Sequence, residues 1–166
     1  MNFLFRAQTL RLAIFLGVSG LLGFGYYLQY AQGLEPCPLC ITQRFFLAVA
    51  GVLGLIAWLH APARVGRRAY AVVGALLTLT GGYFSSRQLY LQSLPADQVP
   101  ACGPSIDYVL DTFPLSEALQ ILLRGDGNCA EVSWQLLGLS IPAWTLIAFA
   151  GIACTWIVQG LNKTNN

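Results

Sequence analysis

The sequence predicts an all-α membrane protein: a bundle of four transmembrane helices with a short amphipathic helix in its second outer loop. Of its 166 residues, 56% are hydrophobic and only 10% are charged, which is less than half the charged fraction of an ordinary soluble domain. Four stretches contain no Asp, Glu, Lys or Arg, and each is long enough to cross about 30 Å of hydrocarbon: residues 12–34, 45–63, 69–86 and 132–162. Helices are expected there, because lipid offers no partners to unpaired backbone groups.

The predicted helices leave little chain for a soluble domain, so residues 1–166 are expected to form a single integral membrane domain. We place the helices at about residues 12–30, 42–60, 69–90 and 143–161, and the two outer loops at about 31–41 and 91–141. A cleaved signal peptide is an alternative for residues 1–30, because a basic start precedes an apolar core. The uncharged stretch is long for such a peptide, however, and it ends on bulky residues such as Tyr26, Tyr27 and Tyr30.

The positive charges predict the orientation of the chain. Basic residues occupy three segments that would share one side of the membrane: Arg6 and Arg11 before the first helix, Arg64, Arg67 and Arg68 between the second and third, and Lys163 after the fourth. The positive-inside rule then places both termini in the cytoplasm. Every cysteine except Cys154 falls outside, which in a bacterium is the oxidising periplasm. The net charge of +2 arises from this asymmetry, and no basic stripe for nucleic acid is present.

The first outer loop carries a Cys-x-x-Cys pair, Cys37 and Cys40, at the mouth of the second helix. Flanking prolines keep Cys37 out of the helix, which is expected to begin near residue 39 or 40. The free N–H groups of that helix end favour a thiolate at Cys40. Arg44 follows one turn deeper on the same face, where a charge is costly enough to need a reason. It either snorkels to lipid headgroups or acts as a fixed cation that stabilises the thiolate and binds an electronegative ligand oxygen.

The second outer loop carries the other two outer cysteines, Cys102 and Cys129. A purely structural disulfide between them would add about 3.5 kcal/mol on the loop-entropy estimate. Cys102 stands between Pro100-Ala101 and Gly103-Pro104, and Cys129 follows the sequence Gly-Asp-Gly-Asn. Such settings are typical of exposed, flexible chain, so they favour thiol exchange over a buried structural bond.

A short helix is predicted between these cysteines, from Pro114 to Arg124, with Gly125 as its stop. Its apolar residues share one face, and its polar residues share the other. The sequence leaves two positions open for this amphipathic helix, either on the membrane surface or against the outer end of the bundle.

Other residues have simpler interpretations. Trp134 and Trp144 flank the entry to the fourth helix, as expected of residues that prefer the membrane interface. Gly81 and Gly82 permit close helix packing or leave room for a flat ligand. Cys154 is expected to be a small apolar packing residue. His60 is the only histidine, which excludes a metal site made of histidines.

Taken together, these motifs resemble the disulfide bond formation protein B (DsbB) family of bacterial inner-membrane thiol oxidoreductases, and the likeness runs along nearly the whole chain. Its carriers are Glu35-Pro36-Cys37-Pro38-Leu39-Cys40 followed by Arg44, Leu91-Gln92-Ser93-Leu94-Pro95, Pro100-Ala101-Cys102-Gly103-Pro104, Gly127-Asn128-Cys129-Ala130-Glu131, Trp134, Leu137-Gly138-Leu139, and Pro142-Ala143-Trp144.

This resemblance implies re-oxidation of a periplasmic DsbA-type dithiol oxidase of thioredoxin fold, with electrons passed to a membrane quinone, either ubiquinone or menaquinone. The partner would attack Cys102 and release Cys129, which would then attack Cys37. Cys40 would be left as the thiolate that contacts the quinone, and Arg44 would bind a quinone oxygen. The implied location is the bacterial inner membrane, with both cysteine pairs periplasmic.

One departure from the family concerns the outer end of the third helix, where some members carry a histidine close to the quinone. Here the segment from 85 to 90 contains Arg87, which becomes a second candidate for the quinone pocket, with snorkelling as the alternative.

Three other functions stay open: a scaffold with structural disulfides, a four-thiolate metal site, and a carrier that passes electrons in the opposite direction to reduce outer disulfides. The metal site usually needs two Cys-x-x-Cys pairs. The reverse carrier needs inner thiols, and only Cys154 is present.

Overall fold

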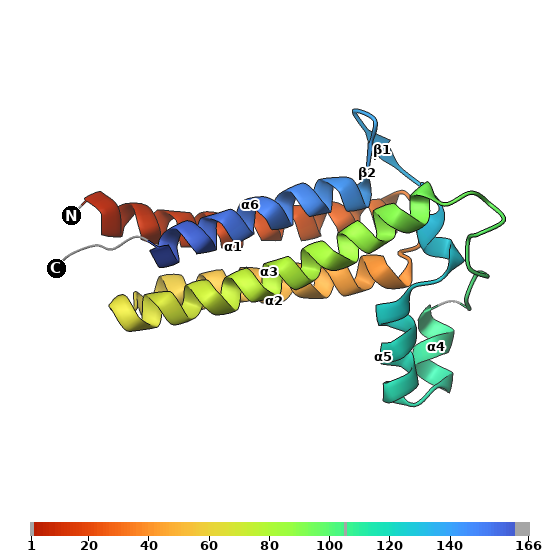
Figure 1. The fold of residues 1–166 in the computed structure, drawn as a ribbon, viewed down its shortest axis with the longest axis horizontal. Coiled ribbons are helices and arrows are strands. Elements are labelled where there is room, and N and C mark those ends of the chain that lie inside the picture. The colour runs from red at the N-terminus through yellow and green to blue at the C-terminus, as the bar shows by residue number, and fades with distance from the viewer. Residues whose placement is uncertain (1, 105, 162–166) are drawn as a thin grey trace.

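Four long helices lie side by side in the structure, a computed structural model that describes residues 2–104 and 106–161 (Figure 1). They are α1 (Asn2–Ala31), α2 (Pro38–His60), α3 (Arg64–Ser93) and α6 (Ile141–Leu161). The start of α1 and the end of α6 share one end of the bundle, and the smaller elements gather at the other end. Lys163, which the orientation argument used, lies outside the described residues, as does the side chain of Arg6.

All four predicted helical stretches are helical, and each helix begins before its predicted start. The prediction followed the uncharged spans, whereas α1 and α3 continue as helix through flanking basic residues, which are good helix formers, and α2 and α6 each begin with a proline in their first turn. Among the described residues, three segments are long and apolar enough to cross a membrane: Ala7–Ala31, Pro38–His60 and Ile141–Leu161. α3 is as long but richer in Gly, Ser and Thr. The chain is therefore an all-α protein with three apolar helices typical of a membrane protein.

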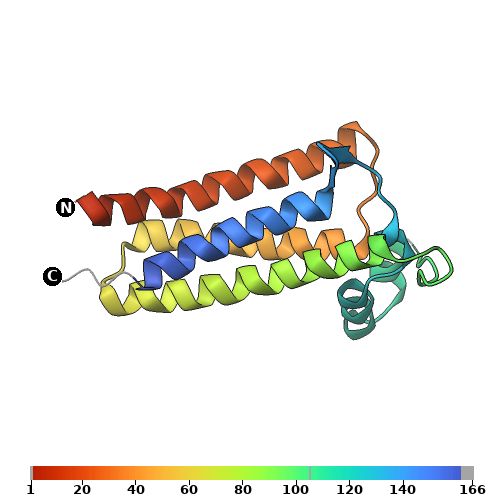
Figure 2. The same cartoon turned by 45° about the horizontal axis from the view of Figure 1, so that its top comes forward.

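The core of the bundle depends on close contact between α3 and α6, which are neighbours in Figure 2. A Cβ atom added at Gly74 would lie 2.5 Å from the Trp156 ring, and one at Gly81 would clash with the Phe149 ring. Both aromatic side chains are 1% exposed. Gly81 therefore serves close helix packing, one of the two roles expected for it.

The chain between α3 and α6 forms several small elements at the outer end of the bundle. These are α4 (Ile106–Thr112), α5 (Leu115–Arg124), a 3₁₀ turn η1 (Gly127–Ala130), and a hairpin of β1 (Gln135–Leu136) and β2 (Leu139–Ser140). The helix expected near Pro114 is α5, and Gly125 follows it with a φ of 73°. The sequence predicted neither α4 nor the hairpin, which turns through Leu137 at a φ of 54°.

α5 packs across the outer end of α2. Its Ala118 is 1% exposed, and the Thr42 hydroxyl of α2 donates a hydrogen bond of 3.0 Å to the Leu122 carbonyl. Three other apolar side chains of α5, at Leu115, Leu119 and Leu123, remain exposed. The bundle thus holds one side of this helix and leaves a second apolar side free.

The structure shows the surroundings of the two tryptophans near α6 and of Cys154. The Trp144 indole donates to the Leu136 carbonyl at 3.2 Å, which ties the start of α6 to the hairpin. Trp134 packs edge-on against Phe24 of α1, with ring centroids 5.6 Å apart. The packing role expected for Cys154 is wrong, because this residue is exposed on the outer surface of α6.

Candidate active site

The start of α2 brings the first two cysteines into contact. Cys37 is the N-cap of the helix, with Pro38 in its first position, where the missing proline N–H costs no hydrogen bond. The Cys40 backbone N–H donates to the Cys37 sulfur at 3.4 Å, and the two sulfurs lie 2.9 Å apart. Cys37 is thus outside the helix as predicted, and the helix begins one or two residues earlier than expected.

Cys129 joins this pair from the second outer loop. Its thiol lies within interaction range of Cys37, which packs against the apolar cluster that contains Cys129; this interaction raises the pKa of the Cys37 thiol and lowers the pKa of Cys129. Its backbone N–H is bonded to the Asp126 carbonyl at 3.1 Å. The structure therefore places three sulfurs, from two loops distant in sequence, in one cluster.

The expected exposed setting is wrong for Cys129, which is 0% exposed. The Gly-Asp-Gly-Asn sequence before it forms a compact turn in which the Asp126 carboxylate accepts from the Asn128 backbone N–H at 3.1 Å. This turn packs against α2, because a Cβ atom at Gly125 would lie 2.8 Å from Leu39. Glycine and asparagine here build a tight turn rather than a flexible one.

Cys102 is exposed, as predicted. Its segment runs alongside the turn that carries Cys129: the Gly127 N–H donates to the Ala101 carbonyl at 3.2 Å, and the Asn128 amide donates to the Gly103 carbonyl at 3.2 Å. All the cysteines are free thiols in this structure. Cys102 is thus open to solvent on one side and adjacent to the Cys129 turn on the other.

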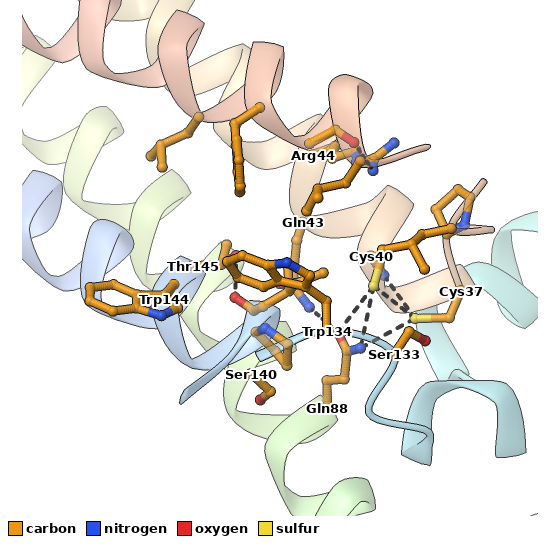
Figure 3. Close-up of a pocket in the computed structure, with 18 of the residues that line it drawn as sticks. Cys37, Cys40, Gln43, Arg44, Gln88, Ser133, Trp134, Ser140, Trp144 and Thr145 are labelled. Carbon is orange, nitrogen blue, oxygen red and sulfur yellow. Dashed lines mark hydrogen bonds between the residues drawn. The ribbon is translucent and has the colours of Figure 1, made fainter. Parts of the chain in front are cut away.

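Gln88 of α3 is a site residue that the sequence did not predict. It is 3% exposed, and its amide nitrogen lies 3.3 Å from both the Cys37 and Cys40 sulfurs (Figure 3). Gln43 of α2 donates to the Gln88 amide oxygen at 2.7 Å. That bond orients the Gln88 amide so that its N–H groups face the sulfurs. Side chains of α2 and α3 therefore together fix the hydrogen-bond donors that face the Cys37–Cys40 pair.

A cavity of about 400 Å³ opens beside Cys40, between the outer halves of α1, α2 and α6 and the hairpin. Most of its wall is apolar, and Trp134 extends across it in Figure 3. The polar groups that reach it include Cys40, Gln43 and Arg44. An apolar cavity with a few polar groups at one side is the usual form of a small-molecule site.

Arg44 is held in place by α1. Its guanidinium donates to the Gly25 carbonyl at 3.0 Å and to the Gln29 side-chain oxygen, and it lies 5.1 Å from the centre of the Tyr26 ring. These contacts point the cation across to the neighbouring helix instead of toward lipid headgroups. The fixed-cation interpretation is therefore the one that the geometry favours. Its charge also acts on Cys40.

Arg87 lies elsewhere. Its Nε donates to the Arg124 carbonyl at 3.0 Å, which attaches the last turn of α5 to α3. Among the described residues, it does not belong to the lining of the cavity. The structure does not bring this candidate to the site. Arg87 instead makes a structural contact, the hydrogen bond that holds α5 against α3.

Comparison with known proteins assigns the chain to a family. The family model described as "Disulfide bond formation protein DsbB" matches residues 7–159. The chain belongs to the DsbB family. A DsbB relative, "Disulfide bond formation protein B" of Hahella chejuensis, is 53% identical over 149 residues, which cover 90% of each chain. The DsbB protein of Saccharophagus degradans is 50% identical over 152 residues, 92% of each chain. No solved structure matches.

Membership of the DsbB family identifies this chain as a membrane protein involved in disulfide bond formation. The family name also identifies a disulfide oxidoreductase, in agreement with a cluster of three thiols beside an exposed fourth. The resemblance drawn from the sequence motifs is thereby confirmed.

Proposed function

We propose that the chain is a thiol:quinone oxidoreductase. It re-oxidises a periplasmic DsbA-type dithiol oxidase of thioredoxin fold and passes the electrons to a membrane quinone, ubiquinone or menaquinone, so that disulfide formation in secreted proteins continues. One observation carries the proposal: Cys37 contacts the Cys40 sulfur and packs against the cluster that contains Cys129, and Cys40 borders an apolar cavity that Arg44 also lines. Sulfurs in contact are placed for exchange.

The relay begins with a Cys102–Cys129 disulfide. A thiolate of the reduced partner attacks the Cys102 sulfur, which is exposed, and Cys129 leaves as a thiolate. The second partner thiol then displaces Cys102, so the partner leaves oxidised and the loop pair is left with two electrons. The lowered pKa of Cys129 supports its role as leaving group, because thiols of low pKa leave faster.

The next exchange transfers those electrons to the first loop. The Cys129 thiolate attacks Cys37 of a Cys37–Cys40 disulfide, and Cys40 leaves as a thiolate. Cys102 then attacks Cys129, which restores the disulfide of the second loop and leaves Cys37 and Cys40 reduced. The packing of Cys37 against the cluster that contains Cys129 supports this order. Gln88 supports it too, because its N–H groups face both sulfurs and stabilise negative charge on either.

The cavity fits a quinone in size and chemistry. A quinone, when bound, accepts two electrons and two protons. The flat ring and isoprenoid tail suit the apolar wall, while Arg44 and Gln43 supply donors for carbonyl oxygens at the side where Cys40 lies. Arg44 also stabilises the anion left on Cys40. Arg87 is not included in the proposed quinone site, because its side chain holds the end of α5 against α3.

The same proposal includes the membrane arrangement. We infer that α3 is a fourth transmembrane helix, because it lies within the bundle beside the three apolar helices (Figure 2). Both termini then face the cytoplasm of a bacterial inner membrane and both cysteine pairs face the periplasm. The exposed apolar side of α5, at Leu115, Leu119 and Leu123, is available to rest on the periplasmic surface of the inner membrane.

Turnover of the purified chain tests the proposal. The protein, supplied with a reduced DsbA-type partner and a quinone, is expected to reduce the quinone, and Cys40→Ser or Cys102→Ser is expected to abolish turnover. Cys154→Ser is the matched control, because Cys154 is exposed on α6 and away from the cluster. Full activity in Cys40→Ser or Cys102→Ser refutes the relay. Thiol trapping in cells without quinone separates it from a scaffold, whose disulfides would stay oxidised.

A further inference from the structure

A second polar cluster is buried at the end of the bundle opposite the cysteines, where α1 begins and α6 ends (Figure 1, left). Its central residues are two arginines: Arg11 of α1 is 3% exposed and Arg67 of α3 is 5% exposed. Their charges repel each other across the helix interface. Their neighbours Arg64 and Arg68 are exposed, so burial distinguishes Arg67 within the same basic segment.

Neutral groups satisfy only part of this cluster. Arg11 donates to the Gln159 side-chain oxygen at 3.1 Å and to the Ala57 carbonyl at 3.2 Å. Arg67 has no hydrogen bond or ion pair from its side chain to the part of the chain that the structure describes. The amide nitrogen of Gln159, a residue 2% exposed, is also a buried donor without a partner in that part.

The sequence supplies no carboxylate side chain to balance these charges. No acidic residue precedes Glu35, none lies between Glu35 and Asp97, and none follows Glu131. All the acidic side chains therefore belong to the outer loops at the far end of the bundle. Two buried like charges without a counter-ion are costly in a membrane protein, and such charges are usually paired.

The cluster lies close to the ends of the apolar spans, where long basic side chains can reach lipid phosphates. Arg11 lies one helical turn inside the apolar span that begins at Ala7, and Gln159 lies just before the end of the span at Leu161. Arg67 lies in the first turn of α3, which begins at Arg64. Guanidinium groups bind phosphate oxygens through a fork of parallel hydrogen bonds, and basic pockets between helices at this level bind acidic lipid headgroups.

We propose that Arg11 and Arg67, with the Gln159 amide, form a binding site for a phosphate anion, supplied by the headgroup of an acidic phospholipid such as phosphatidylglycerol. The two guanidiniums converge on the phosphate from α1 and α3, and the Gln159 amide donates a further hydrogen bond from α6. Binding removes the repulsion between the arginines and connects three helices through one anion. This site is separate from the cysteine cluster and independent of the proposed relay.

Lipid binding by the purified full chain tests the proposal. Phosphatidylglycerol, phosphatidylcholine and inorganic phosphate are titrated separately in detergent, with native mass spectrometry and thermal unfolding as readouts. Phosphatidylglycerol is expected to bind the native chain and Arg68→Gln equally and to raise Tm in both. Arg67→Gln is expected to bind it about tenfold to a hundredfold more weakly, as for loss of a charge-assisted hydrogen bond, and to lose the rise in Tm.

A second variant keeps the test decisive if loss of charge disturbs folding. Arg67→Lys keeps the charge without the fork, so it is expected to bind phosphatidylglycerol with intermediate affinity. Stabilisation by inorganic phosphate at matched concentration assigns the site to the free anion rather than to the lipid. Equal binding of phosphatidylglycerol to Arg67→Gln and Arg68→Gln overturns the proposal. So does equal stabilisation by phosphatidylcholine, which would show that the arginines do not select an acidic headgroup.

Discussion

Replacing Gln88 with leucine should lower the reduction potential of the Cys37–Cys40 pair. The Gln88 amide nitrogen lies 3.3 Å from both sulfurs, and a donor stabilises a reduced, charge-bearing sulfur more than a neutral disulfide sulfur. A hydrogen bond to a charged group contributes about 1.5–3 kcal/mol. Since 30 mV corresponds to about 1.4 kcal/mol for a two-electron couple, we expect a potential about 30–60 mV more negative in Gln88→Leu.

The assay is equilibration of the purified chain with dithiol buffers of defined potential, followed by alkylation and mass spectrometry of the first-loop pair. Gln92→Leu is the matched control: Gln92 lines the same cavity from the same helix, but its side chain accepts from Ser140 at 2.8 Å. An unchanged potential in Gln88→Leu, or an equal shift in Gln92→Leu, would refute the reasoning that the amide stabilises the reduced pair.

Three further predictions concern other parts of the chain. Gly74→Ala is expected to lower the free energy of unfolding by about 1–3 kcal/mol through overpacking against the α6 indole, whereas Gly151→Ala, with nothing within 4 Å of the added Cβ, should not; thermal unfolding in detergent compares them. Cys37→Ala is expected to raise the pH midpoint of Cys129 labelling by a small neutral thiol reagent, because the interaction that lowers the Cys129 pKa is lost and less thiolate is present at a given pH; an unchanged midpoint contradicts the interaction. Arg44→Met is expected to weaken quinone binding about 10- to 100-fold, as for a lost charge-assisted hydrogen bond, and a quinone titration that shows native affinity removes Arg44 from the site.

The sequence predicted the long helices and the first cysteine pair because both depend on local patterns. Uncharged runs locate α1, α2, α3 and α6, and the Cys-x-x-Cys spacing with Arg44 one turn on locates one side of the site. These signals lie within single segments, so they could be read directly. The bounds were less accurate, because helices continue past the apolar spans.

Long-range contacts were beyond such patterns. Gln88 looks like any polar residue near a helix end, and only the crossing of α2 and α3 brings it to the sulfurs. The burial of Cys129 depends on how its turn packs on Leu39, which no local composition reveals. The cluster of Arg11 with Gln159 joins residues from the two ends of the chain. Its arginines were used only as a topology signal.

The position of Cys37 between two other sulfurs has a mechanical consequence for the second outer loop. A sulfur can hold only one disulfide partner, so in the proposed relay Cys37 is bonded either to Cys40, within its own turn, or to Cys129, across to the 3₁₀ turn. In the first state noncovalent contacts alone hold the loop against α2 and α3; in the second a covalent bond also ties it to α2. The mobility of the loop that meets the partner protein therefore depends on which of these two disulfides is present.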